Sequence, residues 1–207
     1  MSNNFDSYIF DMDGTLWDAV DSYCRVWNQT IADCGLESCA PVTRPRLEQL
    51  MGKPLTEIER ELIGNDVPEF FMEKLQENEI SMMPHLGGTL YPGVADTIRE
   101  LHRNGAKLFM VSNCQKSGLP NFLRYTGLEP YFTDWVSFGD NGQEKDVNIR
   151  TLVERYNLKH PVYVGDTAGD MRSTHAAGLP FAWASYGFGH DLEGAEYILK
   201  SFNDLLK

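Results

Sequence analysis

The chain has 207 residues, of which 42% are hydrophobic and 23% charged, a composition typical of a folded protein rather than a disordered tail. Its 30 acidic and 18 basic side chains give a formal net charge of −12 at pH 7, which repels phosphate backbones and anionic lipid surfaces. We therefore expect no nucleic-acid and no membrane partner. The first residues lack the basic end and the apolar run of a signal peptide, so we expect a cytoplasmic protein with reduced thiols.

The first predicted strand covers residues 8–10 and ends at Asp11. The interval 18–90 contains no convincing strand, and its apolar residues recur with the spacing of amphipathic helices. We expect helices at residues 20–34, 47–51, 55–62 and 70–75. A set of helices of this size can form a bundle with its own core, so we expect an inserted helical domain, with the glycine-rich segment 87–93 as a hinge.

Strands and helices alternate in the rest of the chain. Short apolar runs that end in Gly, Asp, Ser or Asn are typical of strands buried in a parallel sheet, and they lie at residues 107–111, 135–138, 161–164 and 181–184. Helical periodicity covers residues 94–101 and 149–156. The alternation predicts an α/β fold with a doubly wound, Rossmann-like parallel sheet, formed by residues 1–17 and 91–207.

Polar residues follow the first two predicted strands of this sheet. Asp11 and Asp13, in the segment Asp-Met-Asp-Gly-Thr, come after the first strand, and Ser112 and Asn113 follow the second. Because the carboxyl ends of parallel strands open into one crevice, these side chains can meet a ligand there. Taken alone, the acidic pair is equally typical of a solvated turn, and the Ser-Asn pair of a strand-to-helix turn.

Two later segments place polar residues at the same predicted edge. Lys145 begins a predicted helix, where a cation is slightly unfavourable to the helix dipole; a nearby anion would compensate, but taken alone an ordinary helix-start lysine fits better. Asp166 and Asp170 follow the strand at 161–164, although a helix N-cap would also explain an aspartate there. Together, polar groups at several strand ends of one sheet are a much more specific sign of a functional site than any of them alone.

In order and chemistry these segments resemble the haloacid dehalogenase-like hydrolase superfamily, which has an aspartate motif after the first strand, a Ser or Thr after the second, a later lysine and a final paired-aspartate motif. The resemblance spans the whole chain. Segment 18–90 looks like the C1-type cap of the branch that includes phosphoglycolate phosphatase and β-phosphoglucomutase. In one departure, Asp146 follows Lys145 where the family often has proline.

The resemblance implies a role for each motif. Asp11 would be the nucleophile that forms an aspartyl phosphate, and Asp13 would protonate the leaving oxygen and then activate water. The ligands of Mg²⁺ would be Asp11, the carbonyl of Asp13, Asp166 and Asp170. The phosphoryl oxygens would be bound by Ser112, the amide of Asn113 and Lys145.

The charge balance at such a site supports a metal ion and a lysine whether or not the resemblance holds. A phosphate dianion about 4 Å from an aspartate meets a repulsion of roughly 4 kcal/mol per unit-charge pair at an effective dielectric of about 20. Mg²⁺ and Lys145 would offset that repulsion.

The helical insertion should select the leaving group, because a cap over the sheet edge contacts the substrate beyond its phosphate. Its basic residues Arg44, Arg46 and Lys53 are candidate substrate contacts, and they equally fit a role as exposed, solubilising charges. Cys114 follows Asn113 with no visible base beside it, which favours a small, partly buried thiol over a reactive one.

The sequence thus predicts a Mg²⁺-dependent phosphatase, monomeric or homodimeric, that hydrolyses a small phosphorylated metabolite of the phosphoglycolate or sugar-phosphate type. Two alternatives stay open. One is a phosphosugar mutase similar to β-phosphoglucomutase. The other is a phospho-acceptor signalling module similar to a receiver domain, which the position of Asp11 after the first strand and the long insertion fit badly. The substrate depends on cap residues, for which a single sequence provides no code.

Overall fold

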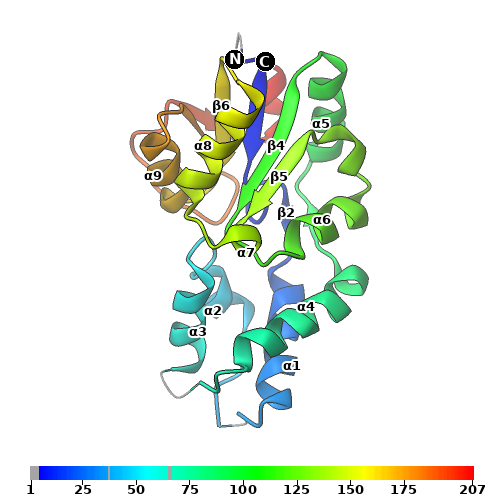
Figure 1. Ribbon diagram of the computed structural model, residues 1–207, viewed down its shortest axis with the longest axis vertical. Helices are drawn as coiled ribbons and strands as arrows, with labels where there is room; N and C mark the ends of the chain where they lie inside the picture. Colours follow the sequence, from blue (N-terminus) through cyan, green and yellow to red (C-terminus); the bar gives the residue numbers. More distant parts are fainter. Residues whose placement is uncertain (1–4, 37, 65–66) are drawn as a thin grey trace.

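The computed structural model describes residues 5–36, 38–64 and 67–207, and it consists of a sheet flanked by helices above a group of four helices (Figure 1). The six strands of the sheet are parallel and lie in the order β5-β4-β1-β6-β7-β8. Their bounds are β1 (Ser7–Phe10), β4 (Lys107–Ser112), β5 (Asp134–Ser137), β6 (Pro161–Gly165), β7 (Phe181–Ala184) and β8 (Tyr197–Leu199). The predicted α/β class and five predicted strands are confirmed. The edge strand β8, short and with Ile198 exposed, was not predicted.

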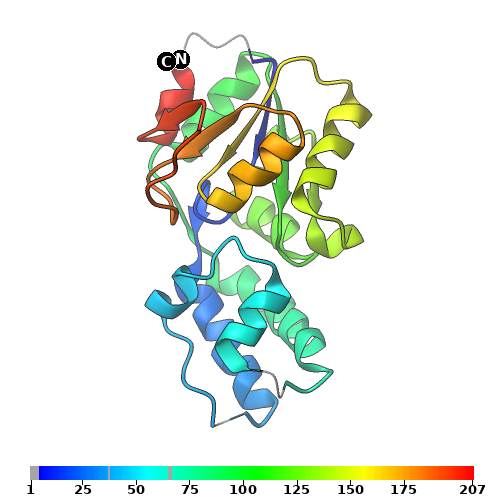
Figure 2. The same ribbon diagram turned by 90° about the vertical axis from the view of Figure 1, so that its left-hand side faces the viewer.

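Helices cover both faces of the sheet (Figures 1 and 2). Tyr8 and Phe10 belong to the core cluster that contains α5 (Val94–Arg103), α6 (Gly118–Thr126) and η2 (Phe202–Leu206). Ile9, which points the other way, packs in the cluster of α8 (Lys145–Tyr156) and α9 (Ala168–Ala176). Because both faces are buried, the strands are continuously apolar instead of alternating, which is why short apolar runs located them. The remaining short helices are η1 (Glu129–Tyr131) and α7 (Phe138–Asn141).

The described part of the insertion contains four helices, as expected, namely α1 (Val20–Asp33), α2 (Arg44–Glu48), α3 (Leu55–Ile63) and α4 (Phe71–Leu86). Helix α2 begins and ends earlier than the predicted range 47–51, with which it shares only its last two residues. Helix α4 is much longer than the predicted 70–75 and continues through Pro84 in its last turn. Its buried face holds Leu75 and Met83, but also Asn78 and Glu79. These two polar residues interrupt the apolar periodicity of the helix. The periodicity therefore predicts a helix that ends at residue 75.

Two chain crossings join the helical insertion to the sheet. They pair as antiparallel strands β2 (Trp17–Asp18) and β3 (Thr89–Leu90), which corrects the expectation that 18–90 has no strand. Next to β3, Gly87 has a φ of 59°, a conformation that favours glycine, and a Cβ there would also displace the Tyr125 ring, which lies 1.9 Å from its position. The paired crossings place the helices over the carboxyl edge of the sheet (Figure 2).

Within the described ranges, no helix combines the length and the apolar character needed to cross a membrane.

Candidate active site

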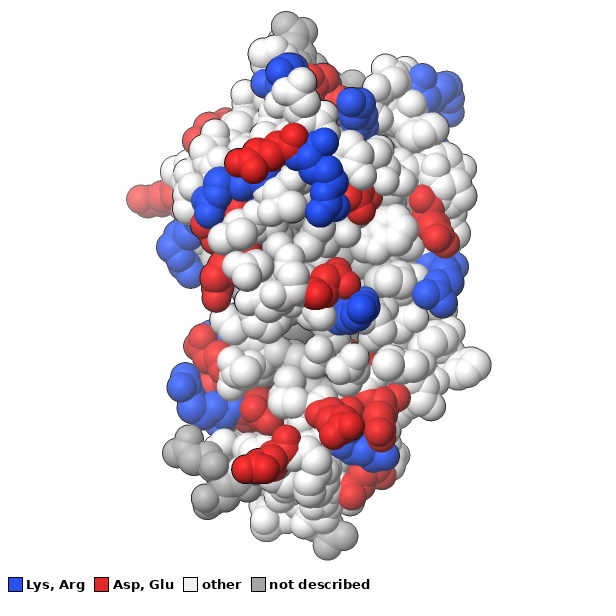
Figure 3. Space-filling model, viewed as in Figure 1, with Lys and Arg blue, Asp and Glu red and all other residues white. Residues whose placement is uncertain are grey.

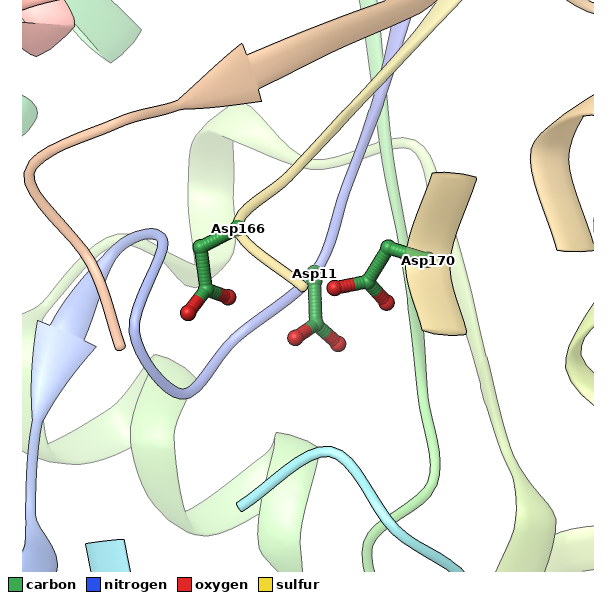
Figure 4. Close-up of side chains that lie close together, drawn as sticks. All are labelled: Asp11, Asp166 and Asp170. Atoms are coloured by element: carbon green, nitrogen blue, oxygen red, sulfur yellow. The ribbon is translucent and has the colours of Figure 1, made fainter. Parts of the chain in front are cut away.

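Three buried aspartates lie together at the carboxyl edge of the sheet (Figure 4). Asp11 follows β1, Asp166 follows β6, and Asp170 lies in the first turn of α9. One carboxylate oxygen of each lies within 4.8 Å of the others. The parallel pairing of β1 with β6 brings residues separated by most of the chain to one point.

Lys145 lies among these carboxylates. Its Nζ is 2.9 Å from Asp11 Oδ1 and 2.5 Å from Asp170 Oδ1, and all three side chains are buried. The lysine is the first residue of α8, so the helix dipole does not favour its charge. The two aspartates supply the anions that its position in the sequence had indicated.

Burial and mutual repulsion shift the pKa values of the aspartates in different directions. Burial raises the pKa of Asp11 to about 6, although the neighbouring Lys145 charge opposes this shift. Burial, with the charges of Asp170 and Asp11, raises the pKa of Asp166 well above its usual range. Burial also opposes ionisation of Asp170, but the ammonium of Lys145 outweighs it and lowers that pKa. If all three carboxyl groups were ionised, the single cation Lys145 would leave an excess of negative charge, which adds to burial in favouring the protonated forms of Asp11 and Asp166.

Local hydrogen bonds orient Asp166 and Asp170. The Asp170 carboxylate accepts hydrogen bonds from Thr167 N at 2.9 Å and Thr167 Oγ1 at 2.7 Å, in a capping box at the start of α9. Asp166 accepts hydrogen bonds from Thr15 Oγ1 at 3.2 Å and from Phe188 N at 2.8 Å. Asp170 therefore takes part in the capping of α9, as the alternative explanation of its position expected, and it also belongs to the carboxylate cluster.

Gly14 leaves room for this arrangement. It has a φ of 80°, and a Cβ at this position would come within 2.2 Å of Asp166 Oδ2. Both the backbone conformation and the neighbouring Asp166 carboxylate therefore require a glycine directly after Asp13.

The donor set fits a divalent cation such as Mg²⁺. Asp11, Asp166 and Asp170 offer only oxygen ligands, which hard cations prefer, and they carry more negative charge than Lys145 neutralises. A metal ion would offset the burial and the mutual repulsion that raise the pKa values of Asp11 and Asp166.

Asp13 lies beside this cluster but has different partners. Trp17 Nε1 donates to its Oδ1 at 2.9 Å, and the Tyr23 hydroxyl contacts its Oδ2 at 3.4 Å. Burial, and next the charge of Asp11, raise the pKa of Asp13 to about 8. A carboxyl group with this pKa holds a proton at neutral pH and can donate it.

One cavity brings together most of the candidate residues. Its lining includes Asp11, Asp13, Ser112, Asn113 and Lys145 from the sheet edge, and Lys53 from the helical insertion. The loop that holds Lys53 also touches the sheet edge, because Asn113 Nδ2 donates to the Gly52 carbonyl at 3.3 Å. Lys53 Nζ itself lies 2.7 Å from Glu57.

Arg44 and Arg46 do not join the lining of this cavity. Arg44 forms ion pairs with Asp18, with Asp21 at 3.1 Å and with Glu48 at 3.2 Å. Arg46 donates to the carbonyls of Ala40 at 3.1 Å, Glu61 at 3.1 Å and Leu62 at 2.8 Å. Many other surface cations also lie beside acids, as the mixed charges on the face in Figure 3 show. In this structure both arginines are engaged with partners outside the cavity, and a contact with substrate stays a prediction.

Several lining residues were not predicted, namely Tyr23, Trp27, Glu79, Gln115 and Asn121. Tyr23 and Trp27 are four residues apart on α1, a spacing that is equally typical of a core-facing stripe. Cys114 also lines the cavity, and burial raises its pKa, so it stays a protonated thiol.

Comparisons with known proteins place the chain in a family. The sequence model of the family "Haloacid dehalogenase-like hydrolase" matches residues 8–184. The chain therefore belongs to this family, which confirms the resemblance.

Two curated relatives show the similarity over nearly the full length of the chain. Phosphoglycolate phosphatase of Vibrio parahaemolyticus is 27% identical over 96% of this chain and 93% of the relative. Phosphoglycolate phosphatase of Salmonella typhimurium is 27% identical over 98% of this chain and 92% of the relative.

Solved structures share the fold across the whole chain. CbbY from Rhodobacter sphaeroides in complex with phosphate superposes with a TM-score of 0.82 at 22% identity, covering 97% of this chain and 96% of the other. A haloacid dehalogenase-like family hydrolase from Streptococcus pneumoniae reaches a TM-score of 0.86 at 18% identity, with coverage of 98% and 97%.

Proposed function

We propose that this protein is a Mg²⁺-dependent phosphatase that hydrolyses a small phosphorylated metabolite through an aspartyl phosphate. Residues 18–90 would act as a cap over a core formed by residues 1–17 and 91–207. The family and the curated relatives support the class of enzyme. The observation that carries the proposal is the buried cluster of Asp11, Asp166 and Asp170 around Lys145 at the edge of the sheet.

Asp11 is the nucleophile in the first step. Its carboxylate oxygen forms a bond to phosphorus while the bond from phosphorus to the leaving oxygen breaks, and Asp13 transfers its proton to that oxygen. The hydrogen bond from Trp17 holds the Asp13 carboxyl beside Asp11 for this transfer.

Water completes the reaction in the second step. The Asp13 carboxylate removes a proton from a water molecule, whose oxygen bonds to phosphorus as the bond to Asp11 breaks. This step releases inorganic phosphate and restores both carboxyl groups. One residue thus acts first as an acid and then as a base.

Positive charge and hydrogen-bond donors hold the phosphoryl group. Lys145, Ser112 and the amide of Asn113 line the cavity on the sheet side, and they would bind the phosphoryl oxygens. Asp11, Asp166, Asp170 and the Asp13 carbonyl would hold Mg²⁺. When bound, the ion would neutralise charge on the phosphoryl oxygens.

The test measures phosphate release from p-nitrophenyl phosphate and a panel of phosphorylated metabolites, including phosphoglycolate and sugar phosphates, with Mg²⁺ or with EDTA. We expect release only with the metal ion. No release from any compound by the folded, Mg²⁺-bound protein would contradict the proposal. Isomerisation of a sugar phosphate without release would identify a mutase instead.

A further inference from the structure

The cap helices surround the part of the cavity that would receive the leaving group. Because the phosphoryl group is expected at the sheet edge, the side chains of the cap face the remainder of the substrate. Most of them are aromatic or aliphatic, for example Tyr23, Trp27, Leu47, Leu55, Ile58 and Met83. Aromatic rings of this kind attract ammonium groups through their faces.

Glu79 is an unusual member of this wall. It lies on α4, four residues after Leu75 and four before Met83, and is only 7% exposed. It lines the cavity, and within the described part of the chain its carboxylate has no hydrogen-bond or ion-pair partner. A buried carboxylate without a partner carries a desolvation cost that a bound ligand can offset.

The lysines that line the same cavity are engaged with other acids. Lys53 lies 2.7 Å from Glu57, and Lys145 contacts Asp11 and Asp170. Neither is therefore free to neutralise Glu79 in this structure. When Glu79 is ionised, a substrate with a carboxylate beyond its phosphate would meet an unpaired negative charge. An ammonium group would instead meet a counter-ion, and its own charge would favour the ionised form of Glu79.

On the basis of the phosphatase function proposed above, we propose that Glu79 makes the site selective for an amino alcohol phosphate, whose leaving group carries an ammonium group, and disfavours phosphate esters whose leaving group carries a carboxylate. The site would thus differ in substrate class from what the names of the curated relatives state for those proteins.

The experiment compares three two-carbon esters that differ in the charge of the leaving group: phosphoethanolamine, 2-hydroxyethyl phosphate and phosphoglycolate. Phosphate release with Mg²⁺ yields kcat/KM for each, with p-nitrophenyl phosphate as a reference substrate. The variants are Glu79→Gln, which keeps the shape but removes the charge, and Glu73→Gln as the control, because Glu73 lies exposed on the same helix.

We expect kcat/KM of the unmodified protein to fall from the ammonium to the hydroxyl to the carboxylate ester. Glu79→Gln should reduce the ratio of the ammonium to the carboxylate ester at least tenfold, about 1.4 kcal/mol, while Glu73→Gln should leave it within twofold. Circular dichroism checks that each variant is folded, and the ranking in the unmodified protein tests the inference without any variant.

Three results would count against the inference. A preference of the unmodified protein for phosphoglycolate over 2-hydroxyethyl phosphate would overturn it, as would an unchanged ratio in folded Glu79→Gln. Loss of phosphoglycolate hydrolysis in Lys53→Met, with the other esters unaffected, would show that Lys53 binds a carboxylate and would also overturn it. If p-nitrophenyl phosphate is hydrolysed, these results leave the proposed function intact, whereas no hydrolysis of any ester contradicts both.

Discussion

Lys145 is buried together with the two carboxylates that it contacts. Its side chain is 4% exposed, and those of Asp11 and Asp170 are 5% and 1% exposed. Burial disfavours the charged lysine, but the two aspartates outweigh this effect and raise its pKa. The same lysine therefore stabilises the fold and places a positive charge where a phosphoryl group would bind.

Replacing Lys145 by Met should lower the free energy of unfolding by about 3 kcal/mol or more without Mg²⁺, because it leaves buried carboxylates without a counter-charge. Added Mg²⁺ should recover part of the loss. Urea denaturation with and without the metal ion measures both effects. Lys53→Met, which removes an exposed pairing with Glu57, is the control and should have little effect. Equal losses in the two variants would contradict the role of the buried cluster.

Replacing Asp11 by Asn should reduce phosphate release at least about a thousandfold, because an amide cannot act as the nucleophile. Asp96→Asn is the control, since Asp96 lies exposed on α5 with its side chain 89% accessible. The assay is Mg²⁺-dependent release from p-nitrophenyl phosphate. An active Asp11→Asn protein would show that another residue attacks phosphorus.

Glu79 makes a pH-dependent contribution to stability. Burial raises its pKa from 4.5 to about 7, so the folded state binds the proton more tightly than the unfolded state. Stability should therefore fall as the pH rises from about 4.5 to about 7. Glu79→Gln should be more stable than the unmodified protein by about 3 kcal/mol at pH 8, and by little at pH 4.5. Urea denaturation at both pH values tests this, and an equal difference at the two would contradict it.

At the scale of elements, the loop between α2 and α3 connects the cap with the sheet edge. Gly52 has a φ of 84°, and a Cβ there would approach Thr167 Cγ2 to 2.9 Å. Its carbonyl accepts the hydrogen bond from Asn113. The loop can therefore approach the start of α9 closely only because residue 52 has no side chain.

Replacing Gly52 by Ala should lower kcat/KM at least about tenfold, because a displaced loop no longer closes the cavity over substrate. Gly35→Ala is a matched control, since Gly35 has a φ of 68° but nothing within 4 Å of the added Cβ. Both variants should lose about 1 kcal/mol of stability from the backbone strain alone. The same kcat/KM in the two variants would contradict a role of the loop contact.

Across the whole molecule, acidic groups exceed basic ones, with a formal net charge of −12. The buried aspartates concentrate part of this charge at one point of the fold. A cation that binds only there favours the folded state over the unfolded chain. The cytoplasmic location, the lack of a nucleic-acid partner and the monomeric or homodimeric state stay predictions from the sequence.

Mg²⁺ at about one hundred times its dissociation constant should raise the free energy of unfolding by about 2.7 kcal/mol. Asp166→Asn should remove most of this gain, because it deletes one carboxylate of the cluster. Thermal unfolding with MgCl₂, or with NaCl at equal ionic strength, separates binding from screening. The same gain in the variant would show that the ion binds elsewhere.

The sequence by itself determined five of the six strands of the main sheet and the residue types at their ends. Strand position and the residues at strand ends are local properties of the sequence. An apolar run such as Tyr8-Ile9-Phe10 forms a buried strand, and the aspartates that follow it then lie where the strand ends, at the edge of the sheet. Lys145 could be predicted as well, since a cation at a helix start indicates a nearby anion.

The tertiary structure alone decided which cap residues face the cavity. The sequence does not distinguish Arg44, Arg46 and Lys53, which are all basic residues of the cap. The packing of the helices pairs the two arginines with residues outside the cavity and leaves Lys53 in its lining. Glu79 interrupts an apolar pattern, which locally suggests the end of a helix. It faces the cavity because α4 continues past it and packs against α1, and such long-range packing is not encoded in any short segment.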